Sequence, residues 1–367
     1  MAPSGHADAS PRGDHPNGFK EGSLKIICLE EHTVDADIAR ASQAVLTSEA
    51  GYMADWGSRV EDKPASFADN RPHLVSPKEA VAAAREVGAS RIVAMGQHGI
   101  DVQVLSYSSP LQMVPTSQAV ELARAANDRV AASVYANPMR FAAFAALPWQ
   151  EPGAAAAELE RTVTQMGMVG TLLLGRPGQM FLDDSRYEPV LAKLSELKVP
   201  IYLHPGFPLS QVREPYYSGL DKEVSARLSM FGWGWHNEAG IQVIRMILSG
   251  RFEQYPDLQV ISGHWGEMVP FYLQRMDDTI PREATRLSRS ITETYKRHVY
   301  VTPSGMLNLP HFEFVHKVLG VDRILYSVDY PYLTLTGARE FLESFPISQR
   351  DKEKIAHGNA EALLGLG

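Results

Sequence analysis

The sequence predicts a (β/α)8 barrel, and two observations lead to this fold. From residue 24 onward, eight short apolar runs rich in β-branched residues alternate with longer segments of helical pattern. Such alternation is typical of parallel strands joined by crossover helices. Histidines and carboxylates follow the first, fifth, sixth and eighth runs, as expected where the carboxyl ends of barrel strands converge. A doubly wound open sheet, the alternative, would gather these residues at a single switch point.

The first half of the chain supplies four predicted strands, at residues 24–29, 91–95, 140–147 and 169–174. Helices are expected between them at residues 37–49, 76–87, 116–134 and 152–166. The second of these opens on Ser76-Pro77, with the proline in its first turn. Between residues 33 and 75, the remaining sequence carries few periodic signals.

The second half repeats the same rhythm. Strands are expected at residues 200–204, 258–262, 299–302 and 323–328. Helices are expected at residues 187–197, 238–249, 267–278, 310–319, 335–345 and 349–364. An aromatic-rich insertion at residues 205–237 follows the fifth strand, and loops of this length are usually lids or subunit contacts. A small satellite core over the barrel rim is an equally open interpretation.

Composition limits the other classes of function. We expect one domain at residues 23–367, preceded by a disordered tail at residues 1–22 that is rich in Gly, Pro, Asp and His and resembles no targeting peptide. The net charge of −8 with scattered Lys and Arg argues against a nucleic-acid partner. No run reaches the ~18 apolar residues that span a membrane. The single cysteine, Cys28, fits the reducing cytoplasm.

Glu30 and His32 stand two residues apart at the end of the first predicted strand. Alternate strand residues share a face, so both side chains are expected to point into the barrel, with Glu31 turned the other way. Burying a carboxylate beside an imidazole is costly unless something pairs with them, and a divalent cation would remove that cost. A simple ion pair at the barrel rim is the alternative.

His204 and Asp329 end the fifth and eighth predicted strands, and a proline follows each within two residues. Taken singly, the first is a candidate core histidine and the second a candidate helix cap. Together with Glu30 and His32 they form a set of two imidazoles and two carboxylates without a thiolate. This set suits one divalent ion, Zn²⁺ or Mn²⁺, with a coordination position left for water or substrate.

His264 and Glu267 lie three residues apart where the sixth strand becomes a helix. The carboxylate can therefore fix the imidazole's tautomer and raise its basicity, which predicts a group for proton transfer or substrate hydrogen bonding. Arg275, farther along the same helix, is a candidate for holding a substrate carboxylate. A structural pair and a surface ion pair are the respective alternatives. His98 and His236 are weaker candidates for lining a pocket.

These motifs resemble the amidohydrolase-2 family. The resemblance rests on Glu-x-His after strand one, His-Pro after strand five, Gly-His-x-Gly-Glu after strand six and Ser-Val-Asp-Tyr-Pro after strand eight. The family includes metal-dependent nonoxidative decarboxylases of aminocarboxymuconate semialdehyde and of hydroxybenzoates such as γ-resorcylate. The resemblance implies a (β/α)8 barrel, one catalytic divalent metal and a homodimer or homotetramer.

Carried onto this chain, the resemblance makes Glu30, His32, His204 and Asp329 the metal ligands and His264 with Glu267 the catalytic pair. Arg275 would match an arginine that reaches into the neighbouring subunit's site. A glutamate at the position of Glu30 is similar to the γ-resorcylate branch, whereas other branches carry histidine there. Gly206 departs from the arginine that often follows His-Pro in the benzoate decarboxylases.

The expected activity is that of a metal-dependent carboxy-lyase acting on a hydroxylated aromatic or similarly conjugated carboxylic acid. Asp329 would donate a proton to the carbon that bears the carboxylate. The principal alternative is a hydrolase that uses a metal-activated water on a lactone or amide, with His264 as the base. A barrel that binds a metal or ligand without catalysis is a third interpretation.

Overall fold

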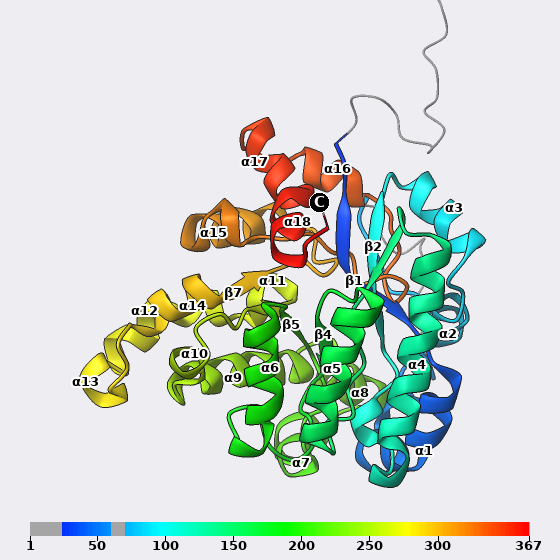
Figure 1. Ribbon diagram of the computed structural model, residues 1–367, viewed down its shortest axis with the longest axis horizontal. Coiled ribbons are helices and arrows are strands. Elements are labelled where there is room, and N and C mark those ends of the chain that lie inside the picture. Colours follow the sequence, from blue (N-terminus) through cyan, green and yellow to red (C-terminus); the bar gives the residue numbers. More distant parts are fainter. Residues whose placement is uncertain (1–23, 60–69, 367) are drawn as a thin grey trace, which may run out of the picture.

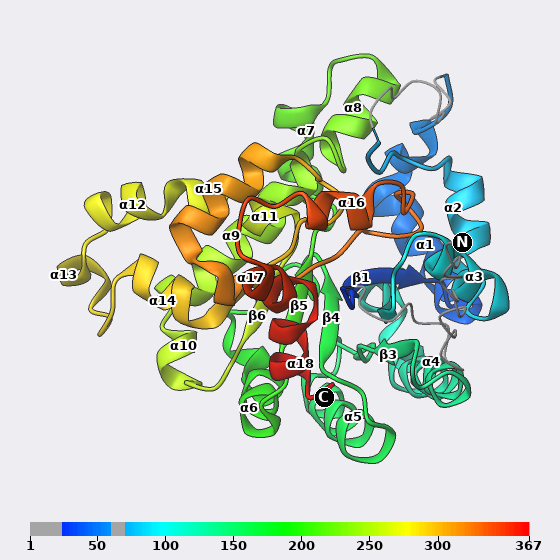
Figure 2. The same ribbon diagram turned by 90° about the horizontal axis from the view of Figure 1, so that it is seen from above.

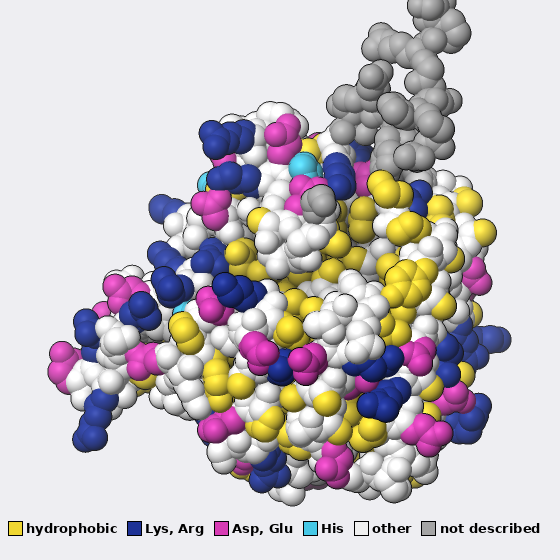
Figure 3. Space-filling model, in the orientation of Figure 1, with side chains coloured by type: hydrophobic (Ala, Val, Ile, Leu, Met, Phe, Trp, Pro, Cys, Tyr) yellow, Lys and Arg dark blue, Asp and Glu magenta, His cyan; other side chains and the backbone are white. Residues whose placement is uncertain are grey.

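The computed structural model describes residues 24–59 and 70–366 (Figure 1). The tail predicted at residues 1–22 lies outside these ranges and stays a prediction. On the face shown in Figure 3, basic and acidic side chains are interspersed. Within the described ranges, no helix is both long enough and apolar enough to cross a lipid bilayer.

The described residues form a closed ring of parallel strands surrounded by helices (Figure 2). Parallel pairing joins β1 to β2 to β3 in one sheet and β4 to β5 to β6 to β7 in another. Isolated parallel bridges join Ala145 to Thr171, Val301 to Ile324 and Glu31 to Tyr330, and these close the ring. The predicted (β/α)8 barrel is confirmed. The strands are β1 (Ile27–Thr33), β2 (Val102–Tyr107), β3 (Phe141–Ala143), β4 (Thr171–Leu174), β5 (Ile201–His204), β6 (Val260–Ser262) and β7 (Val299–Val301).

The eighth predicted strand, at residues 323–328, takes its place in the ring without forming a regular ladder. Leu325 N donates to Val301 O at 2.8 Å on one side, and Leu29 N donates to Tyr326 O at 3.1 Å on the other. This segment therefore closes the barrel between β7 and β1, and we call it the eighth segment.

The strand predicted at residues 91–95 is wrong, because these residues lie in a helix. Arg91 and Met95, four residues apart, are the buried positions of that helix, as expected for one helical face. The second strand is instead β2, at residues 102–107, where no strand was predicted. A short apolar run does not distinguish a strand from a buried helical segment by periodicity alone.

The predicted helices agree in position with observed ones, and the one at residues 152–166 has the predicted ends. The helices at residues 210–217, 222–229 and 291–298 were not predicted. Pro77 opens α2, where the Ser76 side chain caps Glu79 N, and Gly167 ends α5 in the left-handed conformation. The helices are α1 (Ala36–Ala50), α2 (Pro77–Ala84), α3 (Ala89–Gln97), α4 (Thr116–Ala136), α5 (Pro152–Met166), α6 (Glu188–Leu197), α7 (Ser210–Tyr217), α8 (Lys222–Ser229), α9 (Gly234–Leu248), α10 (Arg251–Gln254), α11 (His264–Glu267), α12 (Val269–Thr279), α13 (Arg282–Thr285), α14 (Ile291–His298), α15 (Leu309–Leu319), α16 (Ala338–Glu343), α17 (Gln349–Glu353) and α18 (Asn359–Leu364).

The barrel interior is filled by a compact cluster of apolar side chains that includes Ile27, Leu29, Tyr202 and Ile261, with Ala360 of α18 packed against it. In Figure 1, α18 lies at one end of the barrel, and α1, α7 and α8 lie at the other. A second, larger cluster fills the layer between strands and helices. The interior is thus a packed core, and any site must lie at an end of the barrel.

Candidate active site

The four predicted ligands meet at the carboxyl ends of the strands. One nitrogen or oxygen atom of each of Glu30, His32, His204 and Asp329 lies within 4.8 Å of every other. Glu30 and His32 are fully buried, and His204 is 8% exposed. The register of β1 against β2 shifts between Cys28 and Glu31. This shift lets Leu29 fill the barrel while Glu30 and His32 face the site.

The atoms that face one another here lack other partners. His32 Nε2 lies 3.1 Å from Asp329 Oδ1, and His204 Nε2 lies 3.3 Å from Glu30 Oε1. Glu30 Oε1, His32 Nε2 and Asp329 Oδ1 are buried without a hydrogen-bond partner among the described residues. Because buried polar atoms are normally paired, this convergence of lone pairs fits a divalent cation.

Both imidazoles are oriented by their other nitrogen. His204 Nδ1 donates to the carbonyl oxygen of Pro205 at 2.8 Å, which leaves its Nε2 with a free lone pair. His32 Nδ1 lies 3.1 Å from the hydroxyl of Ser106 on β2. Burial lowers the pKa of His204 well below its usual range, and the neighbouring His32 and His264 lower it further. His204 is therefore neutral, which is the form that binds metals.

The two carboxylate oxygens of Glu30 have different surroundings. Oε2 accepts hydrogen bonds from the hydroxyls of Tyr202 and Ser304, and Tyr202 in turn lies 2.8 Å from Thr302 Oγ1. Oε1 is left toward the ligand cluster. Burial raises the pKa of Glu30. A bound cation would favour its ionised form.

Asp329 reaches the site because the backbone turns sharply at this residue. Its φ is +68°, in the left-handed region that costs an L-residue about 1–2 kcal/mol. Its carbonyl oxygen accepts from Leu333 N at 3.0 Å, which holds the turn. Backbone strain at a functional residue is typical of sites that need one fixed geometry.

His264 and Glu267 form the predicted pair, and a third residue joins them. Glu267 Oε1 accepts from His264 Nδ1 and its Oε2 accepts from His236 Nδ1, both at 2.8 Å. Five consecutive residues with positive φ, His264 to Met268, build the turn that permits this contact. His236 was only a weak candidate in the sequence, because its role depends on a partner 31 residues away.

Electrostatics differ sharply across this triad. Burial alone would lower the pKa of His264, but the carboxylates of Glu267, Glu30 and Asp329 raise that pKa to about 9. Burial alone would raise the pKa of Glu267, but the two histidines lower it below its usual value. A buried carboxylate thus stays ionised between two imidazoles and stabilises the charged form of His264.

Arg275 does not join this site. It is exposed on the outer helix α12 and is absent from the side chains that line the cavity described below. In Figures 1 and 2, α12 and α13 project from the barrel. Within one chain, Arg275 is therefore no part of the active site, and its contact with a second copy stays a prediction.

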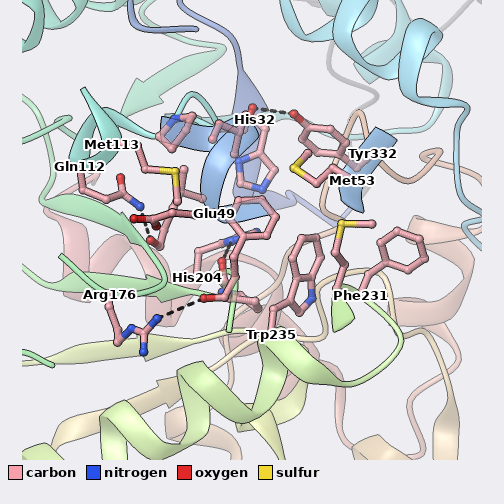
Figure 4. Close-up of a pocket in the computed structure, with 18 of the residues that line it drawn as sticks. His32, Glu49, Met53, Gln112, Met113, Arg176, His204, Phe231, Trp235 and Tyr332 are labelled. Atoms are coloured by element: carbon pink, nitrogen blue, oxygen red, sulfur yellow. Dashed lines mark hydrogen bonds between the residues drawn. The ribbon is translucent and has the colours of Figure 1, made fainter. Parts of the chain in front are cut away.

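A cavity of about 240 Å³ opens beside the ligand cluster and is lined by His32, His204 and Asp329 at one end. Figure 4 shows Trp235 and Phe231 on one side of the two histidines and Gln112 and Arg176 on the other. Apolar residues form most of the remaining wall. Six of them come from α1, from the 3-10 turn Gly51–Asp55 with the Trp56 that follows it, and from the insertion: Val45, Leu46, Met53, Trp56, Phe207 and Met230.

The aromatic insertion at residues 205–237 contributes directly to this wall. The ring of Phe231 meets that of Trp56, with centroids 4.9 Å apart, so the insertion touches the segment after α1 across the cavity. Trp233 and Tyr216 instead remain 45% and 71% exposed. Phe231 and Trp235 of the insertion therefore line the cavity, whereas Trp233 and Tyr216 face solvent, and a lid role stays a prediction.

Gly206 departs from the arginine expected in related decarboxylases for a steric reason. A Cβ atom at residue 206 would lie 2.3 Å from the Cα atom of Gly175. The next residue along from Gly175, Arg176, lines the cavity instead, with Nη1 3.0 Å from Glu238 Oε2 and Nη2 donating to Phe207 O at 3.3 Å. The sequence carried no signal for this close approach of two loops.

Comparison with known proteins gives a consistent result. A family model described as amidohydrolase matches residues 53–366. The decarboxylase orsB of Emericella nidulans is 35% identical over 288 residues, which cover 76% of this chain and 86% of that protein. The γ-resorcylate decarboxylase of a Polaromonas species is 32% identical, covering 93% of this chain and 98% of its own.

A solved structure extends the likeness to the fold. The dihydroxybenzoic acid decarboxylase from a Polaromonas species, with bound manganese and the inhibitor 2-nitroresorcinol, superposes with a TM-score of 0.77. It is 30% identical, and the match covers 94% of this chain and 98% of that one. With its barrel, its ligand cluster and a family model matched over most of its length, this chain belongs to the amidohydrolase family.

Proposed function

We propose that this protein is a metal-dependent nonoxidative decarboxylase of a hydroxylated aromatic carboxylic acid. One observation carries the proposal: four ligand atoms converge within 4.8 Å at the floor of a cavity with aromatic walls. The names of the relatives, which are decarboxylases of this substrate class, support the same activity.

Glu30, His32, His204 and Asp329 would hold one divalent ion. When bound, that ion supplies the positive charge that holds the substrate's carboxylate and an adjacent hydroxyl oxygen. We favour Mn²⁺ because a related structure contains manganese, and Zn²⁺ remains the alternative that the same ligands accept.

The chain's own residues then move one proton. Asp329, whose carboxyl group lines the cavity, would deliver a proton to the ring carbon that bears the carboxylate. The bond from that carbon to the carboxylate breaks, CO₂ leaves, and the bonding electron pair restores the aromatic ring. Asp329 afterwards recovers a proton from solvent.

His264 is not among the side chains that line the cavity, but its ring lies beside that of His204, with centroids 6.3 Å apart. From there it would act as a hydrogen-bond donor to a substrate held at the ligand cluster. Its Nδ1–H is already committed to Glu267, so its Nε2–H is available only in the imidazolium form. The carboxylate of Glu267 raises the pKa of His264 and so favours that form.

The wall of the cavity would shield the ring from water. Phe207, Phe231 and Trp235 of the insertion line this wall together with Leu46 of α1 and Met53 of the 3-10 turn that follows α1. Excluding water strengthens the electrostatic contacts of the carboxylate end. These side chains therefore give ring selectivity while the polar end gives orientation.

The test is an assay of CO₂ release from a panel of hydroxybenzoates with Mn²⁺ present, beside an assay of ring opening on a panel of lactones. The proposal expects CO₂ and the matching phenol. Turnover of the lactones alone would establish the hydrolase. Metal binding with no turnover in either panel would favour the binding protein.

The finer assignments are proposals as well. We propose one catalytic domain at residues 23–367, a cytoplasmic location and a homodimer or homotetramer. Phe271, Tyr272 and Phe314 form an exposed aromatic patch on α12 and α15, with exposures of 70%, 51% and 39%. Arg275 lies on the same helix as Phe271, which supports a second copy as the occupant of this patch. Light scattering of the parent and of a Phe271→Asp variant tests the assembly.

A further inference from the structure

Three buried polar side chains form a hydrogen-bond network behind the ligand cluster, outside the cavity. Arg91 Nε donates to Gln103 Oε1 at 2.7 Å, and Gln103 Nε2 donates to Glu31 Oε2 at 2.9 Å. Arg91 is 1% exposed, and Gln103 and Glu31 are fully buried. Buried charges of this kind are rare unless they are paired, so the arrangement needs an explanation.

Both ends of this network hydrogen-bond to backbone groups of predicted metal ligands or of their neighbours. Arg91 Nη1 donates to the carbonyl oxygen of His32 at 2.8 Å. At the other end, Glu31 Oε1 accepts from the amide of Val328, the residue before Asp329, at 3.1 Å. The guanidinium of Arg91 also lies over the ring of Tyr330, the residue after Asp329, 5.0 Å from its centroid.

The seam between β1 and the eighth segment explains why side chains are needed here. Leu29 N donates to Tyr326 O and His32 N donates to Tyr330 O. The two donors lie three residues apart on β1, and the two acceptors lie four residues apart on the stretch 326–330, where the eighth segment continues past residue 328. This stretch therefore carries one extra residue, as in a β-bulge. Glu31 supplies the acceptor for Val328 N within that irregular stretch.

We propose that Arg91, Gln103 and Glu31 are positioning residues that hold His32 and Asp329 at metal-binding separation across this seam. The inference rests on the proposed metal centre. None of the three lines the cavity or belongs to the four-ligand cluster, and their hydrogen bonds go to one another and to the backbone, so they are not catalytic residues. They act through the backbone on either side of the two ligands.

The hydrogen bonds of this network run in one direction. The amide oxygen of Gln103 faces the donor Arg91, and its NH₂ group faces an oxygen of Glu31. The other oxygen of Glu31 accepts from Val328 N. Loss of the amide therefore leaves the buried guanidinium of Arg91 and the buried carboxyl group of Glu31 without their link.

The closing experiment measures the dissociation constant of Mn²⁺ by competition with a chromophoric chelator, using the full chain. Gln103→Met keeps the volume of the side chain and removes both amide bonds. Arg91→Lys keeps the charge and removes the planar fork that reaches two acceptors. We expect each variant to bind Mn²⁺ about 10- to 100-fold more weakly, the usual effect of groups that orient metal ligands.

A matched control exists among the outer helices. Asn127 Nδ2 donates to Glu158 Oε1 at 2.8 Å, and Arg161 Nη2 pairs with the same oxygen at 2.7 Å. Asn127 and Glu158 are also buried, and no member of this second hydrogen-bond network lines the cavity. Asn127→Leu should lower the melting temperature and leave the Mn²⁺ dissociation constant unchanged.

The combined variant adds a stricter criterion. Because Arg91 and Gln103 act through one hydrogen-bond network, the double substitution should weaken Mn²⁺ binding no more than the single substitution with the larger effect. Unchanged Mn²⁺ binding in the folded single variants, or additive losses in the double one, would overturn the inference. Failure of the parent chain to bind Mn²⁺ at all would instead overturn the proposed function.

Discussion

Replacing Glu267 by glutamine removes the carboxylate that two histidines share. In the parent chain each oxygen accepts one imidazole N–H at 2.8 Å. A glutamine offers one oxygen and one NH₂ group, so one of the two histidines must face a donor. Losing a hydrogen bond to a charged group costs about 1.5–3 kcal/mol, which corresponds to a rate about 10- to 150-fold lower.

The pH dependence of the rate should change in a defined direction. Glu267 is the largest of the influences that raise the pKa of His264 to about 9. A bound cation offsets the charges of Glu30 and Asp329, so Glu267 then dominates. In Glu267→Gln, burial lowers the pKa of His264, and the activity that needs the imidazolium is lost at lower pH than in the parent.

The assay is CO₂ release against pH at saturating Mn²⁺, with metal content measured in the same samples. Metal content should be unchanged, because Glu267 is outside the four-ligand cluster. Glu158→Gln, a second carboxylate that is 1% exposed, is the control and should keep the parent's rate and profile. A Glu267→Gln enzyme with the parent's rate and alkaline limb would refute the reasoning.

Four further results are expected. His32→Ala and Asp329→Asn should each lose bound metal and activity, and full activity in both would rule out the ligand set. Gly206→Ala places a Cβ atom 2.3 Å from Gly175; overpacking of this kind destabilises by about 1–3 kcal/mol, which thermal unfolding would detect. Trp235→Ala should raise KM more than it lowers kcat, whereas the reverse would place Trp235 in the chemistry. Chelation should lower the melting temperature, because an ion bound only by the folded chain stabilises it; an unchanged value would contradict a resident metal.

Much of this molecule could be predicted because strands and ligands coincide in the sequence. Each of Glu30, His204 and Asp329 follows an apolar run, and the barrel topology brings the ends of such runs together. The strand predicted at residues 91–95 is wrong because the apolar run 92–95 is too short to show a period that separates a strand from a buried helix.

The remaining errors concern contacts between distant segments. His236 joins Glu267 only after α9 has packed against α11, and the steric limit on Gly206 arises from another loop. Arg275 matches an intersubunit arginine of the family that this sequence resembles, and within one chain it is exposed and outside the active site. Local pattern therefore predicts which residues carry chemistry better than it predicts which residues support them.

The placement of Asp329 near the end of the chain has a consequence for maturation. The other three donors are in place on β1 and β5, but the set is complete only when the last segment has closed the ring against β1. During synthesis, residues 30 to 204 emerge long before this partner does. Binding of an ion by all four donors therefore requires that the ring has closed.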